Sequence, residues 1–276
     1  RGTSDAGAKQ VSAPEEHGLA GQVAIVTGGG RGLGRAMTLG LAQAGVRVIA
    51  TAARELAEVE AVAKEAEREC GDDRVRPLLA DVTRAADCAA AVREAVARFG
   101  RLDILVNNAG MVQTGDDLAD GTLADQPWEA WHRQLEITLL TAVHASRAAI
   151  PHMRAQRHGR IVMVSSVTGP LVAIPGSSAY AAAKGGLKML TRAMATEWAR
   201  HNVQINAIGP GYFATELTAP LVQNPKFNDW ICARTPAGRW GQPEELVGAA
   251  VFLASAASNF VNGQVIYVDG GLLAAI

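Results

Sequence analysis

The chain has 276 residues, a formal net charge of −1, and 49% hydrophobic and 19% charged residues. This composition is typical of a globular protein, and the length suits one large domain. The near-neutral charge gives no argument for nucleic acid as a partner. No apolar run is long enough to span a bilayer, so we expect no membrane partner.

The first residues, 1–20, are polar and mixed in charge, which predicts a flexible leader before a domain at 21–276. Cys70, Cys88 and Cys232 are odd in number and form no CxxC pair. This pattern favours reduced thiols in a cytoplasmic protein. The six histidines form no metal-binding motif, so we expect no metal site.

From residue 22 onward, short β-branched runs alternate with longer alanine-rich stretches. The runs predict strands at Val23–Thr27, Val46–Ala50, Arg76–Ala80, Ile104–Asn107, Ile161–Ser165, Gln204–Ile208 and Val265–Val268. The stretches predict helices at Arg35–Ala44, Glu55–Glu69, Ala86–Phe99, Trp128–Met153, Ser178–Arg200 and Pro243–Ala254. Nearly continuous apolar strands are typical of a parallel sheet covered on both faces, so the alternation predicts a doubly wound α/β fold.

Two long segments carry no such pattern. Met111–Gln126 is rich in Asp and Gly and is expected to be a loop. The segment at about 211–239 contains Pro220, Pro225 and Pro236 and is a candidate substrate lid rather than part of the sheet.

Unusual residue groups follow six of the predicted strands. They are Gly28–Gly34, Thr51–Arg54, Asp81, Asn107–Gly110, Ser165–Gly169 and Pro210–Gly211. Ligands of open parallel sheets bind at the carboxyl ends of the strands. These separate segments therefore predict one common binding crevice.

The run Thr27-Gly28-Gly29-Gly30-Arg31-Gly32-Leu33-Gly34 lies between the first strand and the first helix. Strand-to-helix turns also favour glycine for purely structural reasons. At the first junction, however, glycines allow a pyrophosphate to approach the helix N-terminus, which favours a dinucleotide site.

The end of the second strand bears on the choice of dinucleotide. An NAD site usually has an acid there for the ribose diol, but this chain has Ala52 and no acid until Glu55. Arg31 and Arg54 could instead pair with a 2′-phosphate, and Thr51 could donate a hydroxyl to it. Both arginines could equally be ordinary surface residues. The missing acid favours NADP(H) over NAD(H).

Tyr180 and Lys184 have the i, i+4 spacing that puts them on one helix face. Free tyrosine keeps its proton until about pH 10. A neighbouring ammonium and a positive oxidised nicotinamide would both favour the phenolate, so we expect a lowered pKa and an acid/base role. Taken alone, such a pair is more often an ordinary helix-surface pair. Ser165 and Ser166 end the fifth strand, where a hydroxyl could bond a carbonyl.

Together these motifs resemble the short-chain dehydrogenase/reductase superfamily over residues 20–276. The matching pieces are the glycine-rich turn, Asp81-Val82-Thr83, Asn107-Asn108-Ala109-Gly110, Ser166 with Tyr180-xxx-Lys184, Asn206 with Pro210-Gly211, and Val268-Asp269-Gly270-Gly271. The resemblance implies a Rossmann-type sheet of seven strands, a small-molecule carbonyl/alcohol substrate and a homotetramer.

The resemblance also implies a role for each matching residue. Ser166 would polarise the carbonyl, Tyr180 would donate the proton, and Lys184 would tune the tyrosine and hold the nicotinamide ribose. The remaining cofactor contacts would come from Gly28, Gly30, Gly32 and Gly34 with Leu33, from Asp81 and Val82, from Asn108, Ala109 and Gly110, and from Pro210, Gly211 and Thr215.

Two features depart from the family pattern. Thr138 stands where the family has an asparagine that holds a water for proton relay, and a threonine hydroxyl or a kinked backbone carbonyl could replace it. The spacing between Ser166 and Tyr180 is one residue longer than usual, which leaves both Ser165 and Ser166 as candidates.

Within the superfamily the chain resembles the gluconate 5-dehydrogenases, on Asn206–Glu216, Arg234–Gly241 and the C-terminal end. A sugar-acid or polyol dehydrogenase is therefore the first hypothesis. A 3-oxoacyl-[acyl-carrier-protein] reductase is the second, and a catalytically impaired dinucleotide-binding sensor, which only Thr138 supports, is the third.

Overall fold

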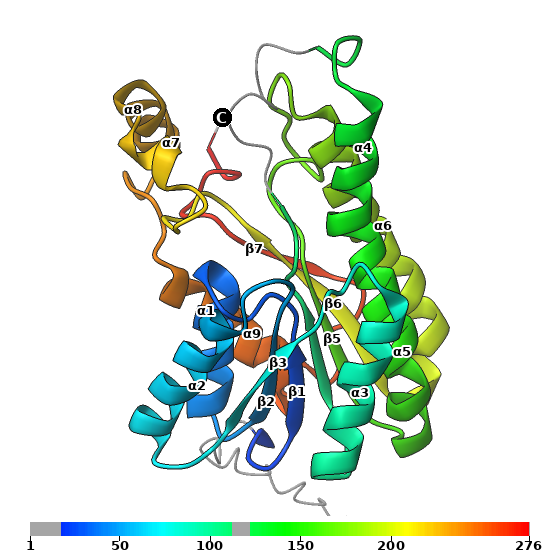
Figure 1. Cartoon of the computed structure of the whole chain (residues 1–276). Coiled ribbons are helices and arrows are strands. Elements are labelled where there is room, and N and C mark those ends of the chain that lie inside the picture. Colours follow the sequence, from blue (N-terminus) through cyan, green and yellow to red (C-terminus); the bar gives the residue numbers. More distant parts are fainter. Residues whose placement is uncertain (1–17, 112–121, 276) are drawn as a thin grey trace, which may run out of the picture.

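A parallel sheet of seven strands forms the centre of the computed structural model, which describes residues 18–111 and 122–275. Its strand order is β3-β2-β1-β4-β5-β6-β7 (Figure 1). The strands are β1 (Val23–Val26), β2 (Arg47–Ala52), β3 (Val75–Leu79), β4 (Ile104–Asn107), β5 (Gly159–Val164), β6 (Val203–Pro210) and β7 (Val265–Val268). The predicted Rossmann-type α/β fold with a seven-strand sheet is confirmed.

The strand order reverses at β1, which pairs with β2 on one side and with β4 on the other. Ala24 lies opposite Val48 in β2 and opposite Ile104 in β4. At such a reversal, the connections after the two central strands leave in opposite directions and open a crevice at the carboxyl edge. The glycine-rich turn follows β1 and therefore lies at this crevice.

Helices cover both faces of the sheet, because alternate residues of each buried strand point to opposite sides. Figure 1 shows α1, α2 and α9 on one face and α3, α5 and α6 on the other. The helices are α1 (Gly32–Gln43), α2 (Leu56–Cys70), α3 (Ala85–Phe99), α4 (Trp128–Leu135), α5 (Thr141–Gln156), α6 (Ser178–Trp198), α7 (Ala219–Gln223), α8 (Pro225–Arg234) and α9 (Val247–Ala254).

The helix predicted at Trp128–Met153 is not a continuous α-helix. The stretch Trp128–Met153 is divided into α4 and α5 by a π-helical turn, Glu136–Leu140. A π turn inserts one residue without ending the helix, and such turns often mark functional sites. Thr138 is at the middle of this turn and is buried.

The segment 211–239 contains α7 and α8, which lie above the carboxyl edge of the sheet (Figure 1). Its closure over a substrate remains a prediction. Residues 1–17 of the predicted leader 1–20 lie outside the described residues, and so do residues 112–121 of the predicted loop Met111–Gln126. Within 18–111 and 122–275, no helix is long and apolar enough to cross a membrane.

Candidate active site

The glycine-rich turn after β1 leaves no room for side chains. Gly28 has φ +63°, in the left-handed region that favours glycine. A Cβ on Gly34 would lie 2.0 Å from the Gly28 carbonyl oxygen, and one on Gly30 would lie 2.9 Å from Glu58 Cβ. The turn is thus a backbone cradle that a pyrophosphate can approach closely.

Helix α1 begins directly at this cradle. The N-cap residue Arg31 makes no side-chain cap hydrogen bond, so its side chain does not cap the N–H groups of the first turn. Gly32 and Leu33 contribute to this turn, and Leu33 packs against the core. Backbone N–H groups and the positive end of the helix dipole favour an anion here. The cradle therefore fits the pyrophosphate of a dinucleotide.

Asn108 braces the cradle from the end of β4. Its side-chain amide donates to the carbonyl oxygens of Thr27 and Gly28, both at 3.0 Å. The backbone N–H groups of Asn108 and Ala109 both donate to the Thr27 hydroxyl at 3.0 Å. In addition to the predicted cofactor contact of Asn108, these hydrogen bonds show that its amide stabilises the conformation of the turn.

The end of β2 carries hydroxyl and guanidinium groups but no carboxylate. The buried Thr51 hydroxyl accepts a 3.4 Å hydrogen bond from the Gly28 N–H. Arg31 is mostly exposed and lies 3.7 Å from Glu58 Oε1. Arg54 is exposed and forms no ion pair among the described residues. Because both guanidinium groups are exposed to solvent, they are accessible to the phosphate of a bound dinucleotide.

After β3, Asp81 and Val82 form the next part of the crevice. The Asp81 carboxylate accepts hydrogen bonds from the backbone N–H and the hydroxyl of Thr83 at 3.0 and 2.8 Å. Val82 is buried, and its aliphatic side chain offers an apolar surface against which an aromatic ring could pack. This pair lies where the resemblance places the adenine contacts.

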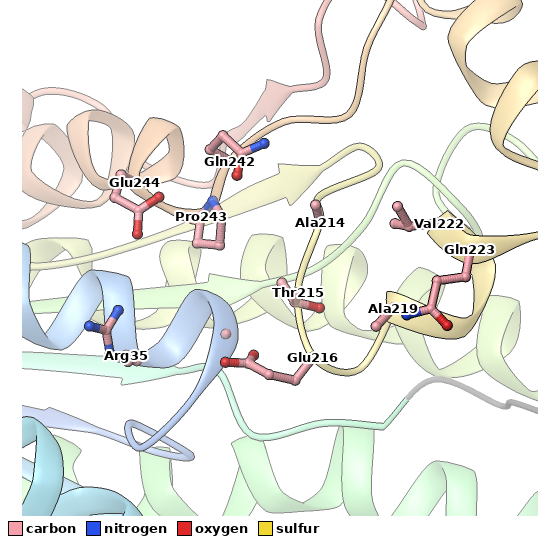
Figure 2. Close-up of a pocket in the computed structure, with 11 residues that line it drawn as sticks. Arg35, Ala214, Thr215, Glu216, Ala219, Val222, Gln223, Gln242, Pro243 and Glu244 are labelled. Carbon is pink, nitrogen blue, oxygen red and sulfur yellow. The ribbon is translucent and has the colours of Figure 1, made fainter.

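A cavity of about 440 Å³ lies between the start of α1 and the segment 214–223. Figure 2 shows Thr215 and Glu216 on one side and Arg35 with Gln242–Glu244 on the other. A Cβ on Gly32 would lie 3.5 Å from the Thr215 side chain. Thr215 was predicted to contact the cofactor although it is distant in sequence from the glycine-rich turn, and it lies against that turn in the structure.

Pro210 is the last residue of β6, and Gly211 follows it on the way to Thr215. The Gly211 N–H donates to the Val268 carbonyl oxygen at 2.9 Å, and a Cβ on Gly211 would lie 2.8 Å from Asp269 Cα. The absent side chain allows β6 and the end of β7 to stay close where the chain turns toward Thr215.

Tyr180 and Lys184 lie on the first turns of α6, above the end of β5. The Lys184 Nζ is 5.7 Å from the centroid of the Tyr180 ring and donates to the Val164 carbonyl oxygen at 2.8 Å. The buried Ser166 hydroxyl interacts with the Tyr180 phenol. The Ser165 hydroxyl instead donates to the Lys184 carbonyl oxygen at 3.2 Å. Of the two candidate serines, only Ser166 faces the phenol.

Burial dominates the pKa values of this pair. It raises the pKa of Tyr180 to about 12, against a smaller lowering by the Ser166 hydroxyl, and it lowers the pKa of Lys184 to about 8. Both shifts follow because a low-dielectric surrounding disfavours the charged forms. The expectation that the lysine lowers the tyrosine pKa is therefore not met by the protein's own groups.

Thr138 reaches the same centre from the π turn. A Cβ placed on Gly110 would lie 3.6 Å from Lys184 Nζ and 3.9 Å from the Thr138 hydroxyl. Gln134, fully buried, donates to that hydroxyl at 2.6 Å and to the Met111 carbonyl oxygen at 3.3 Å. Sequence reasoning missed Gln134, because the hydrophobic pattern does not mark a buried amide one helical turn before Thr138. The relay role of Thr138 remains a prediction.

The described residues contain no group of three or more His, Cys, Asp or Glu side chains that could hold a metal ion. The site instead joins a dinucleotide cradle to a Ser–Tyr–Lys set at one sheet edge. Fold and site define a nicotinamide-dinucleotide-dependent oxidoreductase. The chain belongs to the short-chain dehydrogenase/reductase family, since residues 28–273 match the family model described as enoyl-(acyl carrier protein) reductase.

Known proteins resemble the chain over almost its full length. The 2-dehydro-3-deoxy-D-gluconate 5-dehydrogenase of Formosa agariphila is 42% identical over 93% of this chain and 94% of its own length. The gluconate 5-dehydrogenase of Gluconobacter oxydans is 41% identical over 96% of this chain and 100% of its own. The crystal structure of a gluconate 5-dehydrogenase from Burkholderia cenocepacia, in complex with NADP and tartrate, is 42% identical with a TM-score of 0.86, covering 95% of this chain and 98% of that one.

Proposed function

We propose that this enzyme uses NADP(H) to interconvert a ketone and a secondary alcohol on a sugar acid or polyol, as a gluconate 5-dehydrogenase does. The observation that carries the proposal is the meeting of Ser166, Tyr180 and Lys184 beside the glycine-rich cradle. The substrate class is supported by the similarity to two gluconate-metabolising enzymes and by the tartrate complex of the Burkholderia cenocepacia enzyme.

The chemistry needs one hydride and one proton. A bound nicotinamide dinucleotide supplies the hydride in reduction and accepts it in oxidation. The Ser166 hydroxyl donates a hydrogen bond to the substrate carbonyl oxygen, which polarises the carbonyl. Tyr180 gives its proton to that oxygen in reduction, and its phenolate takes a proton from the alcohol in oxidation. Lys184, on the same helix face, holds the nicotinamide ribose.

The cofactor contacts are proposed from the residues that surround the crevice. The backbone N–H groups of the turn and of α1 would bind the pyrophosphate, and Arg31, Thr51 and Arg54 would bind the 2′-phosphate. The adenine side would be formed by Asp81 and Val82. The ribose and nicotinamide side would be formed by Asn108, Ala109, Gly110, Pro210, Gly211 and Thr215.

An activity assay separates the three hypotheses for the function. The purified protein should form NADPH from D-gluconate and NADP⁺, and should consume NADPH with 5-ketogluconate. The absorbance of the reduced nicotinamide follows both reactions. Turnover of 3-oxoacyl thioesters but of no sugar acid would instead establish the acyl-reductase alternative. Binding of NADPH without turnover of either substrate would establish the impaired sensor.

The cofactor preference depends on Ala52, which ends β2 and is buried where an NAD site has an acid. Ala52→Asp is expected to weaken NADPH binding by about tenfold or more and to shift preference toward NADH, because a carboxylate repels the 2′-phosphate. Titration calorimetry with each cofactor measures the shift. Ala97→Asp, on an exposed site of α3, adds the same charge and should leave both affinities unchanged. Equal or better NADH binding by the unmodified protein would contradict the NADP preference.

We also propose a homotetramer in the cytoplasm. Exposed apolar side chains support assembly, with Met189 on α6 58% exposed, Leu140 44% exposed and Phe260 fully exposed before β7. Clustered exposed apolar side chains favour burial against another copy. The free thiols of Cys70, Cys88 and Cys232 support a reducing compartment.

A further inference from the structure

Tyr212 is a second tyrosine at the carboxyl edge, directly after β6. The ladder between β5 and β6 continues past the end of β5, along the last residues of β6. The Ser165 N–H donates to the Ile208 carbonyl oxygen at 2.8 Å, and the Val167 N–H donates to the Pro210 carbonyl oxygen at 3.0 Å. The segment 165–168, which carries Ser166, therefore runs beside the segment that carries Tyr212.

Thr168 connects the two segments through hydroxyl groups. Its backbone N–H donates to Ser166 Oγ at 3.0 Å, and its buried side chain lies close enough to the Tyr212 phenol to lower the pKa of that phenol, against the larger raising by burial. The Tyr212 phenol is also close enough to raise the pKa of Tyr180 further. Thr168 and Tyr212 thus place two hydroxyl groups beside the Ser166–Tyr180 pair.

The ring of Tyr212 is held by aromatic packing that does not involve its hydroxyl. It meets Trp240 edge-on at 5.7 Å and Phe227 edge-on at 6.2 Å between ring centroids. The Trp240 indole is itself fixed, because its Nε1 donates to Asn228 Oδ1 at 2.9 Å. Such pairs orient a ring with little freedom, so the phenol oxygen has a defined position.

A hydroxyl has one donor and two acceptor positions. A hydrogen bond between Tyr212 and Thr168 would use one donor and one acceptor, so at least one donor and several acceptor positions are left for a substrate. A substrate hydroxyl can both accept from and donate to such a pair. The methylene chain of a fatty acyl group can do neither and would leave these partly buried hydroxyls unpaired.

We propose that Tyr212 and Thr168 form a specificity contact, which binds a substrate hydroxyl next to the reacting carbon and restricts the enzyme to polyhydroxylated substrates. This inference rests on the proposed function, because it needs Tyr180 to act on the neighbouring oxygen. A site built to hydrogen-bond a substrate hydroxyl discriminates strongly against analogues that lack it. The contact is therefore the feature that separates sugar acids from acyl thioesters in this chain.

The test compares Tyr212→Phe with the unmodified protein on two ketones, 5-ketogluconate and the hydroxyl-free cyclohexanone. Phenylalanine keeps the ring in its aromatic packing and removes only the hydroxyl. We expect kcat/KM to fall by at least about tenfold for 5-ketogluconate and to stay the same or rise for cyclohexanone, which no longer leaves a hydroxyl unpaired. Thr168→Val should show the same selective loss, and Thr168→Ser should retain the unmodified value.

Tyr267→Phe is the matched control, because Tyr267 lies on β7 and its buried hydroxyl has no hydrogen-bond partner within residues 18–111 and 122–275. It should leave kcat/KM unchanged on both ketones. An equal loss on both ketones, or no loss on either, in Tyr212→Phe would overturn the specificity contact. Absence of all turnover in the unmodified protein would instead overturn the proposed function. Titration of D-gluconate into the NADP⁺-loaded protein would then decide the inference, which requires at least about tenfold weaker binding in Tyr212→Phe.

Discussion

Replacement of Tyr180 by phenylalanine is expected to lower turnover by about a hundredfold or more, with NADPH affinity nearly unchanged. The substitution removes the proton donor but keeps the ring and the helix, and a general acid or base usually contributes at least this factor. The phenol acts on the transition state rather than on the bound cofactor, so the loss falls on kcat. Steady-state kinetics with 5-ketogluconate and calorimetric NADPH titration measure the two quantities separately.

The control for this loss is again Tyr267→Phe, which removes a buried hydroxyl on β7 to which the proposed mechanism gives no role, and it should retain normal turnover. Near-normal turnover in Tyr180→Phe would show that another group moves the proton. The mechanism proposed for this site would then be wrong, although the fold and the family would stand.

The pH dependence of the same enzyme follows from the sign of the tyrosine shift. Burial raises the pKa of Tyr180 to about 12, so the phenol of the protein alone stays protonated and is ready to donate in reduction. Oxidation needs the phenolate, so its rate should rise with pH. The positive charge of a bound oxidised nicotinamide lowers the pKa, which should move this rise below pH 12 and toward neutral pH.

The sheet and the cofactor cradle could be predicted because their signals are local. Buried strands such as β4 are short apolar runs, and the predicted range Ile104–Asn107 is the observed one. The glycines after β1 are required by the backbone itself, since a Cβ on Gly34 would overlap the Gly28 carbonyl oxygen. In both cases a few consecutive residues contain the whole physical reason for the structure.

The polar surroundings of the reacting groups could not be predicted in this way. Gln134 meets Thr138 through an i, i+4 hydrogen bond, and hydrophobic periodicity does not show which buried polar side chains pair with one another. Tyr212 lies beside the segment of Thr168 because the ladder extends past the end of β5, along the last residues of β6. The tyrosine pKa was predicted with the wrong sign for the protein alone, because sequence spacing gives the distance to Lys184 but not the depth of burial.

Lys184→Met is expected to differ from Tyr180→Phe, because it should weaken cofactor binding as well as lower turnover. The lysine is buried with only 6% of its surface exposed, and methionine can fill its volume without the ammonium. Loss of Nζ removes the proposed ribose contact and the hydrogen bond to the Val164 carbonyl oxygen, which is 2.8 Å long. We therefore expect NADPH affinity to fall by about tenfold or more, the effect of losing a charge-assisted hydrogen bond.

A pH series of NADPH titrations makes this prediction specific to the ammonium. Burial lowers the pKa of Lys184 to about 8, so its charge is present below about pH 8 and is lost above it. Affinity of the unmodified protein should then decrease as pH rises through this value, whereas Lys184→Met should lack that step. Lys188→Met, one helical turn further along α6, removes an amine that donates to the Pro170 carbonyl oxygen at 3.5 Å, and it should keep the unmodified pH profile. Unchanged NADPH affinity in Lys184→Met, with the pH step retained, would assign the ribose contact to another residue and leave Lys184 acting on Tyr180 alone.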